Sequence, residues 1–171
     1  RSGTVPTSCY VPICGYQLLQ ISLPEAMVPT EQNEYLVSKI PDLTAYRAIG
    51  VGPGIGTDPL TVQAVKELLK SATTPLVLDA DALNIISKNP DFFQLLPPNS
   101  ILTQHPKEFE RLFGKTNNAF ERLNLQVQKS KALQIFIILK GGYTSISTPD
   151  GQVYFSSAGN PGMGTGGSGD V

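Results

Sequence analysis

Short apolar runs alternate with amphipathic stretches along most of the chain, and this alternation predicts strands connected by helices. The apolar runs are too short for helices and are bounded by turn residues, as is typical of buried strands. The predicted strands span residues 8–11, 48–51, 76–78, 100–103, 135–139, 144–147 and 153–155. The predicted helices span residues 13–22, 59–70, 106–113 and 119–133, with a further helical segment that ends near residue 96 and is interrupted near residue 90.

Local signals sharpen several of these boundaries. Asp58 can cap the N-terminus of the helix that Pro59 then begins. The sequence Thr-Pro-Asp-Gly at residues 148–151 predicts a turn between the last two strands. Residues 31–46 are polar and weakly patterned, which predicts a mixture of surface helix and loop.

The order of these elements predicts an α/β fold with a mostly parallel sheet that is covered by helices on both faces. In such sheets ligands bind at the carboxyl ends of the strands. Four stretches rich in glycine or polar residues directly follow predicted strands, at residues 50–56, 79–84, 103–105 and 140–144. We therefore expect these four loops to converge on one ligand-binding edge.

Composition narrows the class of protein. The 171 residues are 40% hydrophobic with a formal net charge of −1, so the basic surplus typical of nucleic-acid binding is missing. No apolar run approaches the length of a membrane helix, and the chain does not open on a signal peptide. Two cysteines, Cys9 and Cys14, and a single histidine make neither a disulfide framework nor a His-rich metal centre. We expect a protein of the reducing cytoplasm without nucleic-acid or membrane partners.

The last twelve residues, 160–171, are the most unusual stretch of the chain. With Gly159 they contain six of its 16 glycines and end on Ser-Gly-Asp-Val. Backbone N–H groups in such a run can form a nest that holds phosphate. Asp170 would repel a phosphate, so it suggests chemical work such as accepting a proton. The alternative is a flexible glycine–serine linker.

Each of the other candidate motifs has a structural alternative to its functional interpretation. The glycines at 52–56 fail the dinucleotide-binding fingerprint, and no P-loop motif is present. They indicate either a tight turn or close approach of the backbone to a ligand. Asp79 and Asp81 could hold a metal ion, or they could cap the end of the strand and form Asx turns.

Three further positions carry the same ambiguity. Asn84 could hydrogen-bond a ligand or cap the helix. His105 could contact a polar ligand, or it could be an N-cap with Glu108 in the first turn. Lys140, followed by two glycines, could contact phosphate or lie on the surface of a β-turn.

Together these motifs resemble the ADP-dependent NAD(P)H-hydrate dehydratase family, which has the ribokinase-like fold. The matching stretches are residues 51–56, 78–84, 102–109, 139–144 and 160–171. The family's usual Thr-Pro-His-Pro-Gly-Glu is changed here at Gln104 and Lys107. The resemblance implies a three-layer αβα sandwich. Residues 1–171 are expected to form a single ribokinase-like domain that lacks the family's opening segment and closing helices.

The resemblance also implies a reaction. The substrate would be NADH or NADPH hydrated at C6 of the nicotinamide, and ADP or ATP with Mg²⁺ would phosphorylate the C6 hydroxyl. Loss of phosphate would then restore the double bond, which makes the enzyme a lyase. A homo-oligomer is expected.

The same resemblance assigns residues to the three parts of the site. The catalytic base would be Asp170. Substrate-binding residues would be Gly52, Gly54, Gly56, Asn84, His105 and Asp170. Nucleotide-binding residues would be Lys140, Gly141, Gly142, Tyr143, Thr144, Gly166, Gly167, Ser168 and Gly169. No protein ligands to a metal ion are assigned.

Two other functions stay open from the sequence. A small-molecule kinase of the same fold, acting on a hydroxymethylpyrimidine, a thiazole or a sugar alcohol, would use the same glycine-rich site and Asp170. It would differ by releasing a stable phosphorylated product. A nucleotide-binding module without chemistry is the other alternative.

Overall fold

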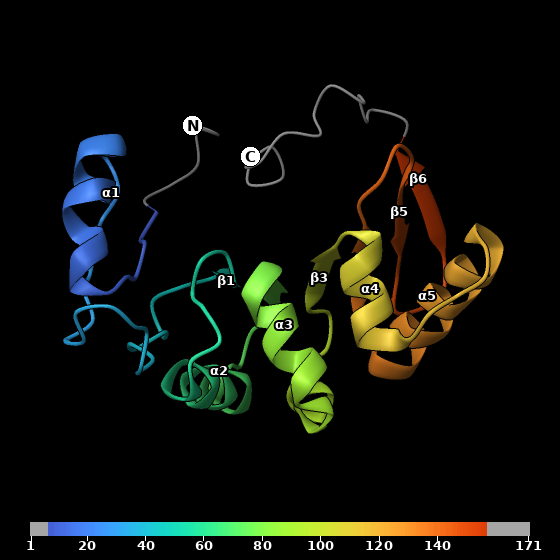
Figure 1. Ribbon diagram of the computed structural model, residues 1–171, viewed down its shortest axis with the longest axis horizontal. Helices are drawn as coiled ribbons and strands as arrows, with labels where there is room; N and C mark the ends of the chain where they lie inside the picture. The colour runs from blue at the N-terminus through green and yellow to red at the C-terminus, as the bar shows by residue number, and fades with distance from the viewer. Residues whose placement is uncertain (1–6, 157–171) are drawn as a thin grey trace.

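The computed structural model describes residues 7–156, and a six-stranded mixed sheet forms the centre of this region (Figure 1). Its strands lie side by side in chain order, and β1 to β4 are parallel while β5 and β6 are antiparallel to their neighbours. The strands are β1 (Ile49–Val51), β2 (Leu76–Leu78), β3 (Ile101–Gln104), β4 (Phe136–Leu139), β5 (Thr144–Ser147) and β6 (Val153–Ser156). The predicted mostly parallel sheet is therefore confirmed.

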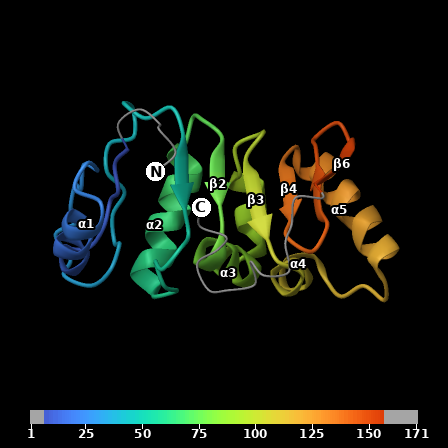
Figure 2. The ribbon, with the colours of Figure 1, turned by 90° about the horizontal axis from the view of Figure 1, so that it is seen from above.

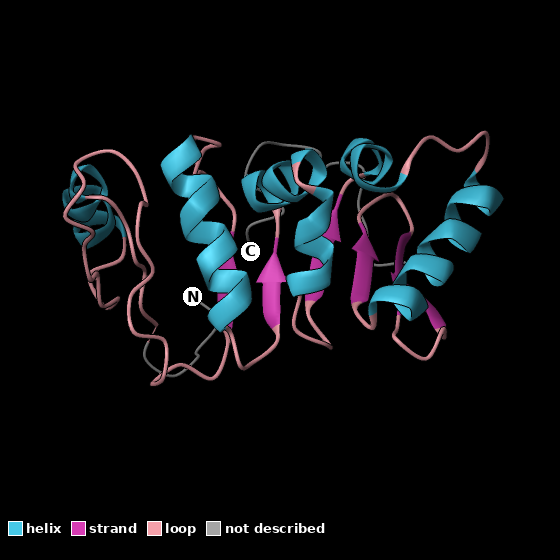
Figure 3. Cartoon of the chain, turned by 90° about the horizontal axis from the view of Figure 1, so that it is seen from below, coloured by secondary structure: helices cyan, strands magenta, loops and turns pink. Residues whose placement is uncertain are grey.

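Within residues 7–156, two helices precede β1, and the others connect the parallel strands. They are η1 (Ile13–Gly15), α1 (Tyr16–Ser22), α2 (Pro59–Ser71), α3 (Ala80–Lys88), η2 (Pro90–Leu95), α4 (Pro106–Phe113) and α5 (Ala119–Leu133). Figures 2 and 3 show the sheet from its two sides, and α2 to α5 all cover the same face. Across residues 7–156, no helix has both the length and the apolar character that crossing a bilayer requires.

The core lies between the sheet and these four helices. Leu76, Leu78, Leu102 and Ile137 point toward the helices and are fully buried, because alternate residues of a strand share one face. On the opposite face, Val77 is 38% exposed. Residues 7–156 thus supply one of the two helical layers that a three-layer sandwich requires.

The local boundary signals are confirmed. The Asp58 carboxylate accepts a hydrogen bond of 2.9 Å from the Leu60 N–H at the start of α2, with Pro59 as the first helical residue. The predicted interruption of the helical segment near Pro90 is also confirmed, because α3 ends at Lys88 and the 3₁₀ helix η2 begins at Pro90. Proline cannot continue a helix, since it lacks the N–H and clashes with the preceding turn.

The prediction of surface helix within residues 31–46 is wrong, because this segment has no helix. The buried carboxylate of Glu31 organises it instead, accepting hydrogen bonds of 2.8 Å from the backbone N–H groups of both Ser38 and Lys39. Burial raises the pKa of Glu31, but these hydrogen bonds outweigh it and lower the pKa below its ordinary value. The predicted strand at 8–11 is reduced to isolated bridges from Ser8 to Met27 and from Val11 to Thr30.

Two buried glutamines differ sharply in their partners. Gln126 of α5 donates to the carbonyls of Ile137 (2.9 Å) and Ser145 (3.2 Å) and accepts from the Ser145 hydroxyl (2.8 Å). Gln104 at the end of β3 is equally inaccessible, yet neither end of its amide has a hydrogen-bond partner within residues 7–156. A buried amide without hydrogen-bond partners lowers the free energy of unfolding, whereas hydrogen bonds compensate for the burial of a paired one.

We therefore expect opposite responses to the same substitution in the full-length protein. Gln104→Met should leave the free energy of unfolding unchanged or raise it by about 1–2 kcal/mol, because an unpaired amide is removed. Gln126→Met should lower it by about 2–4 kcal/mol, because three partners lose their hydrogen bonds. Urea unfolding measures both. Equal losses for the two variants would contradict this prediction.

Candidate functional site

The glycine loop after β1 packs directly against the end of β2. The Asp79 N–H donates to the Val51 carbonyl at 3.2 Å. At Gly52, where φ is +142°, a Cβ would lie 1.7 Å from the Asp79 carbonyl oxygen. Only glycine fits this contact, so the loop is both a tight turn and a site of close backbone approach.

An ion pair crosses the end of the sheet. Lys140 directly follows β4 and Asp79 directly follows β2, while β3 lies between these two strands. The Lys140 Nζ lies 2.9 Å from Oδ2 and 3.2 Å from Oδ1 of Asp79. Asp79 Oδ1 also accepts the Ala80 N–H at 2.8 Å, so this residue at the end of β2 is also the N-cap of α3.

A second set of hydrogen bonds joins the glycine loop to α3 and α4. The Gly56 N–H donates to Asp81 Oδ2 at 2.9 Å, and Asn84 Nδ2 donates to Asp81 Oδ1 at 3.1 Å. Arg111 of α4 donates to the Asn84 side-chain carbonyl. Asn84 lies inside α3 and does not cap it, and these two bonds leave one N–H and one lone pair of its amide for a ligand.

His105 is the N-cap of α4. Its Nδ1 accepts from the N–H groups of Lys107 (3.2 Å) and Glu108 (3.4 Å). The Glu108 carboxylate accepts the His105 N–H at 2.8 Å, which completes a reciprocal capping box. The predicted capping role is confirmed. The His105 side chain is 47% exposed, and its Nε2 lies 3.5 Å from Glu108 Oε1.

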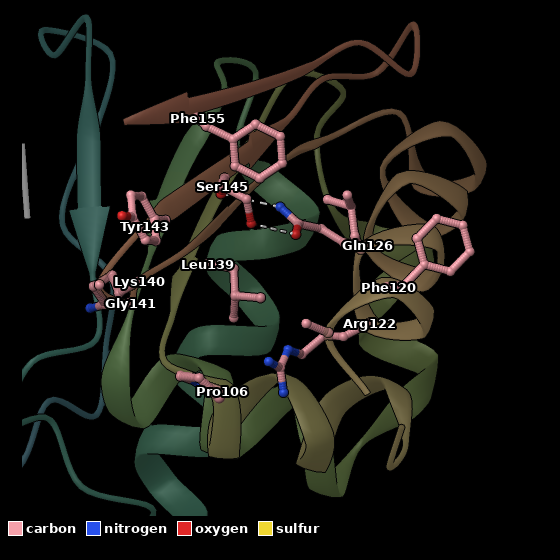
Figure 4. Close-up of a pocket in the computed structure, with 13 residues that line it drawn as sticks. Pro106, Phe120, Arg122, Gln126, Leu139, Lys140, Gly141, Tyr143, Ser145 and Phe155 are labelled. Carbon is pink, nitrogen blue, oxygen red and sulfur yellow. Dashed lines mark hydrogen bonds between the residues drawn. The ribbon is translucent and has the colours of Figure 1, made fainter. Parts of the chain in front are cut away.

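The glycine turn after β4 borders a hollow of 540 Å³ between α5 and the β5–β6 hairpin (Figure 4). Lys140, Gly141, Gly142 and Tyr143 form one wall. The other walls include Phe120, Arg122, Gln126, Leu139, Ser145 and Phe155. The exposed rings of Phe120, Tyr143 and Phe155 could stack on a planar group, while Arg122 could attract an anion.

The described residues do not form a ready metal cage. No group of three or more His, Cys, Asp or Glu side chains within residues 7–156 is placed to hold a metal ion. The carboxylate of Asp79 is held by Lys140 and Ala80, and that of Asp81 by Gly56 and Asn84. Mg²⁺ needs octahedral oxygen ligands and keeps several waters, so it fits here only as a companion of nucleotide phosphates.

The structure brings together the predicted residues of four loops. Backbone or side-chain contacts connect Gly52 and Gly56 to the loop after β2, and Lys140 to both that loop and the end of β3. The predicted residues Asp170, Gly166, Gly167, Ser168 and Gly169 lie outside the described residues.

Sequence reasoning missed two kinds of residue. It did not single out Arg111, although it lies on the same helix as His105, or the aromatic residues Phe120 and Phe155 of the hollow. It also did not pair Asp79 with Lys140. Both follow strands, which was a usable signal, but their contact depends on the order of β2, β3 and β4 in the sheet.

The fold and this edge together define a class of protein. Parallel strands with helical connections, glycine loops at the carboxyl edge and a terminal antiparallel hairpin make an α/β protein of ribokinase-like architecture. A ribokinase-like superfamily protein from Enterococcus faecalis matches with a TM-score of 0.78 and 26% identity, over 96% of this chain and 57% of that one. The predicted fold class is thereby confirmed.

Within this class the family is clear. A family model described as NAD(P)H-hydrate dehydratase matches residues 2–171, so the chain belongs to that family. It is 38% identical over 157 residues to the bifunctional NAD(P)H-hydrate repair enzyme Nnr of Moorella thermoacetica, covering 91% of this chain and 30% of that protein.

A solved structure of the same family supports the assignment. The ADP/ATP-dependent NAD(P)H-hydrate dehydratase from Bacillus subtilis, co-crystallized with ATP/Mg²⁺ and soaked with CoA, matches with a TM-score of 0.78 and 30% identity. The match covers 99% of this chain and 61% of that chain. The chain therefore spans less than two thirds of each of these relatives.

The contact between Gly52 and Asp79 predicts a large effect of a single methyl group. Gly52→Ala should lower the free energy of unfolding of the full-length protein by at least about 3 kcal/mol, because the new Cβ overlaps the Asp79 backbone. Gly54→Ala is the matched control, since Gly54 also has a positive φ but open space around it. It should cost only about 1–2 kcal/mol of backbone strain. Urea unfolding of both variants distinguishes overlap from strain, and equal losses would exclude the overlap.

Proposed function

We propose that the protein restores hydrated NADH and NADPH by nucleotide-dependent dehydration. The observation that carries this proposal is the meeting of two glycine-rich loops, at 52–56 and 140–144, on one sheet edge of a chain that belongs to the NAD(P)H-hydrate dehydratase family. Such an edge can bring a nucleotide and a second substrate together, and proximity supplies much of the catalysis in phosphoryl transfer.

The reaction consists of two steps, a phosphorylation and an elimination of phosphate. In the first, the C6 hydroxyl oxygen of the hydrated nicotinamide forms a bond to the terminal phosphorus of ADP or ATP. The bond from that phosphorus to the leaving nucleotide breaks, and the hydroxyl proton passes to a base. In the second, the C6–O bond breaks, phosphate leaves, and a proton departs from the neighbouring ring carbon as the double bond returns.

In this proposal one glycine-rich loop binds the hydrated cofactor and the other binds the nucleotide. Gly52, Gly54 and Gly56, with His105, contact the hydrated cofactor, and Asn84 fixes this side of the site through Asp81. Nucleotide lies along Lys140, Gly141, Gly142, Tyr143 and Thr144 and reaches the N–H groups of Gly166, Gly167, Ser168 and Gly169. Mg²⁺, held by phosphate oxygens and water, would neutralise charge on the phosphates.

Asp170 is the proposed general base. Transfer to an alcohol requires that the hydroxyl proton be accepted as the new bond forms, and a carboxylate next to a phosphate nest suits that task. A residue selected only to hold phosphate would not be negatively charged. The sequence Gly-Ser-Gly-Asp therefore combines an anion site with a base within four residues.

Membership of the dehydratase family favours this reaction over the kinase alternative. A kinase acting on a hydroxymethylpyrimidine, a thiazole or a sugar alcohol would release a stable phosphate ester, whereas the dehydratase releases inorganic phosphate. Homo-oligomeric assembly and a cytoplasmic location stay predictions.

The activity assay tests both the reaction and its base. Full-length protein with hydrated NADH and either ADP or ATP should restore the absorbance of reduced nicotinamide and release one phosphate per turnover. Asp170→Asn should slow this by roughly 10²–10⁴-fold, the usual cost of losing general base catalysis. Asp150→Asn, in the exposed β5–β6 turn, is the control for loss of a carboxylate and should retain the parent rate. Near-parent activity of Asp170→Asn would show that another group is the base.

Two substitutions at His105 separate its capping role from a substrate contact. His105→Asn keeps a good N-cap for α4 but removes Nε2. It should raise KM for hydrated NADH about 10-fold, the cost of one hydrogen bond, while KM for nucleotide and thermal stability stay nearly unchanged. His105→Ala should add a loss of roughly 1 kcal/mol in stability. Equal increases in both KM values for His105→Asn would contradict the assignment of this loop to the substrate.

A further inference from the structure

The structure points to Asp79 as a positioning residue. We infer that Asp79 holds the Lys140 ammonium over the end of β3, between the two glycine loops, where it meets the phosphoryl group in transit from nucleotide to hydrated cofactor. This inference rests on the proposed function and adds to it a residue outside the assigned catalytic, substrate and nucleotide sets.

The first observation is the direction of the Lys140 side chain. The Lys140 N–H donates to the Gln104 carbonyl at 2.7 Å, so the backbone of Lys140 is fixed beside β3. Its Nζ nevertheless reaches Asp79 at the end of β2, at 2.9 and 3.2 Å from the two carboxylate oxygens. The side chain must cross the end of β3 to make this contact. The charge consequently lies at the end of β2, beside the residue that packs against Gly52 of the 52–56 loop.

The second observation is that Asp79 is the rigid member of the pair. Its N–H is held by the Val51 carbonyl, and its own carbonyl packs against Gly52 with no room for a methyl group. Ala80, which follows it, has the left-handed φ of +48°, which a neighbourhood must impose on a residue with a side chain. Lysine, by contrast, has a flexible four-carbon stem. The carboxylate therefore determines where the ammonium lies.

The third observation is that the pair can still serve a ligand. The side chains of Lys140 and Asp79 are 35% and 17% exposed, so the ammonium is accessible at the edge. An ammonium has three N–H donors, and Asp79 is its hydrogen-bond partner within residues 7–156. A donor remains for a phosphate oxygen. Holding the lysine in place beforehand removes the need to order it during the reaction.

The competing interpretation is purely structural, because Asp79 also caps α3. The two roles differ in their dependence on Lys140. A capping carboxylate stabilises the helix whether or not the lysine is present, whereas a positioning carboxylate has no catalytic effect without it. A double-mutant cycle measures this difference directly.

The cycle uses Asp79→Asn, Lys140→Met and the double variant in the full-length protein, with hydrated NADH and ADP or ATP. Asn keeps the shape and a cap oxygen but removes the charge. Asp79→Asn should lower kcat about 10–100-fold, the scale for a misplaced group, with less than about a threefold change in KM for nucleotide. In the Lys140→Met background, the same substitution should change kcat less than about twofold. Lys140→Gln replaces Lys140→Met if the latter unfolds.

Asp58→Asn is the matched control, because Asp58 caps α2 with a carboxylate but has no lysine partner among the described hydrogen bonds and ion pairs. It should leave kcat unchanged. The inference is overturned if Asp79→Asn leaves kcat unchanged, if its loss persists in the Lys140→Met background, or if Asp58→Asn causes the same loss.

A second readout keeps the inference separate from the proposed function. If the wild-type protein does not restore hydrated NADH, the proposed function fails, and isotope-labelled lysine spectra decide the inference alone. ADP should shift the Lys140 ammonium signal, which is assigned from its absence in Lys140→Met. This shift should fall at least about twofold in Asp79→Asn and persist in Asp58→Asn, as expected when a flexible lysine loses its anchor. An undiminished shift in Asp79→Asn, or none in the wild type, would overturn the inference.

Discussion

The close approach of Gly52 to the backbone of Asp79 is the constraint on which the sheet edge depends. It fixes the loop after β1 against the end of β2, so two loops that are far apart in sequence share one rigid contact. Two carboxylates extend from this point in different directions. Asp79 reaches Lys140 at the end of β4, and Asp81 reaches back to Gly56. A methyl group at Gly52 would therefore disturb more than one turn, because both carboxylates are placed by the same backbone.

Polar contacts stabilise the loops at the carboxyl edge of the sheet, whereas apolar contacts stabilise the core between the sheet and its helices. Leu78, Leu102 and Ile137 are buried under the helices, and the strands end within a residue or two of these positions. Beyond them the loops have little apolar surface to bury, and hydrogen bonds to fixed carboxylates take over. The left-handed φ of Ala80 belongs to this arrangement, since it turns the chain from β2 into α3 within a single residue. Strain of this kind persists only where the surroundings determine it.

Much of this fold could be predicted from the sequence, because its strands are short apolar runs and its helices begin at recognisable caps such as Asp58 and His105. Residues 31–46 could not be predicted, since a segment organised by one buried carboxylate, Glu31, leaves no periodic pattern. Periodicity also does not reveal which face of a sheet a helix covers.

The candidate site was likewise predictable from the sequence only in part. The sequence indicated which loops meet, because each follows a parallel strand. It did not indicate that Lys140 pairs with Asp79, because that contact requires the order of three strands and the direction of a flexible side chain. The place of Asp170 relative to this edge stays a prediction from the glycine-rich sequence around it.

His105 shows how one side chain can meet a structural and a chemical demand together. Asn, Asp and Ser are the preferred N-caps, so capping alone gives no reason for histidine at this position. The imidazole caps α4 with Nδ1, and its Nε2 lies 3.5 Å from Glu108 Oε1 on the exposed side of the ring. Because Nδ1 acts as the acceptor, Nε2 carries the proton in the neutral ring and is a hydrogen-bond donor. A shorter capping residue would leave no such donor at the carboxyl edge of β3. Histidine at this position therefore fits the proposed ligand contact, and the capping box with Glu108 holds the start of α4 in place around the ring.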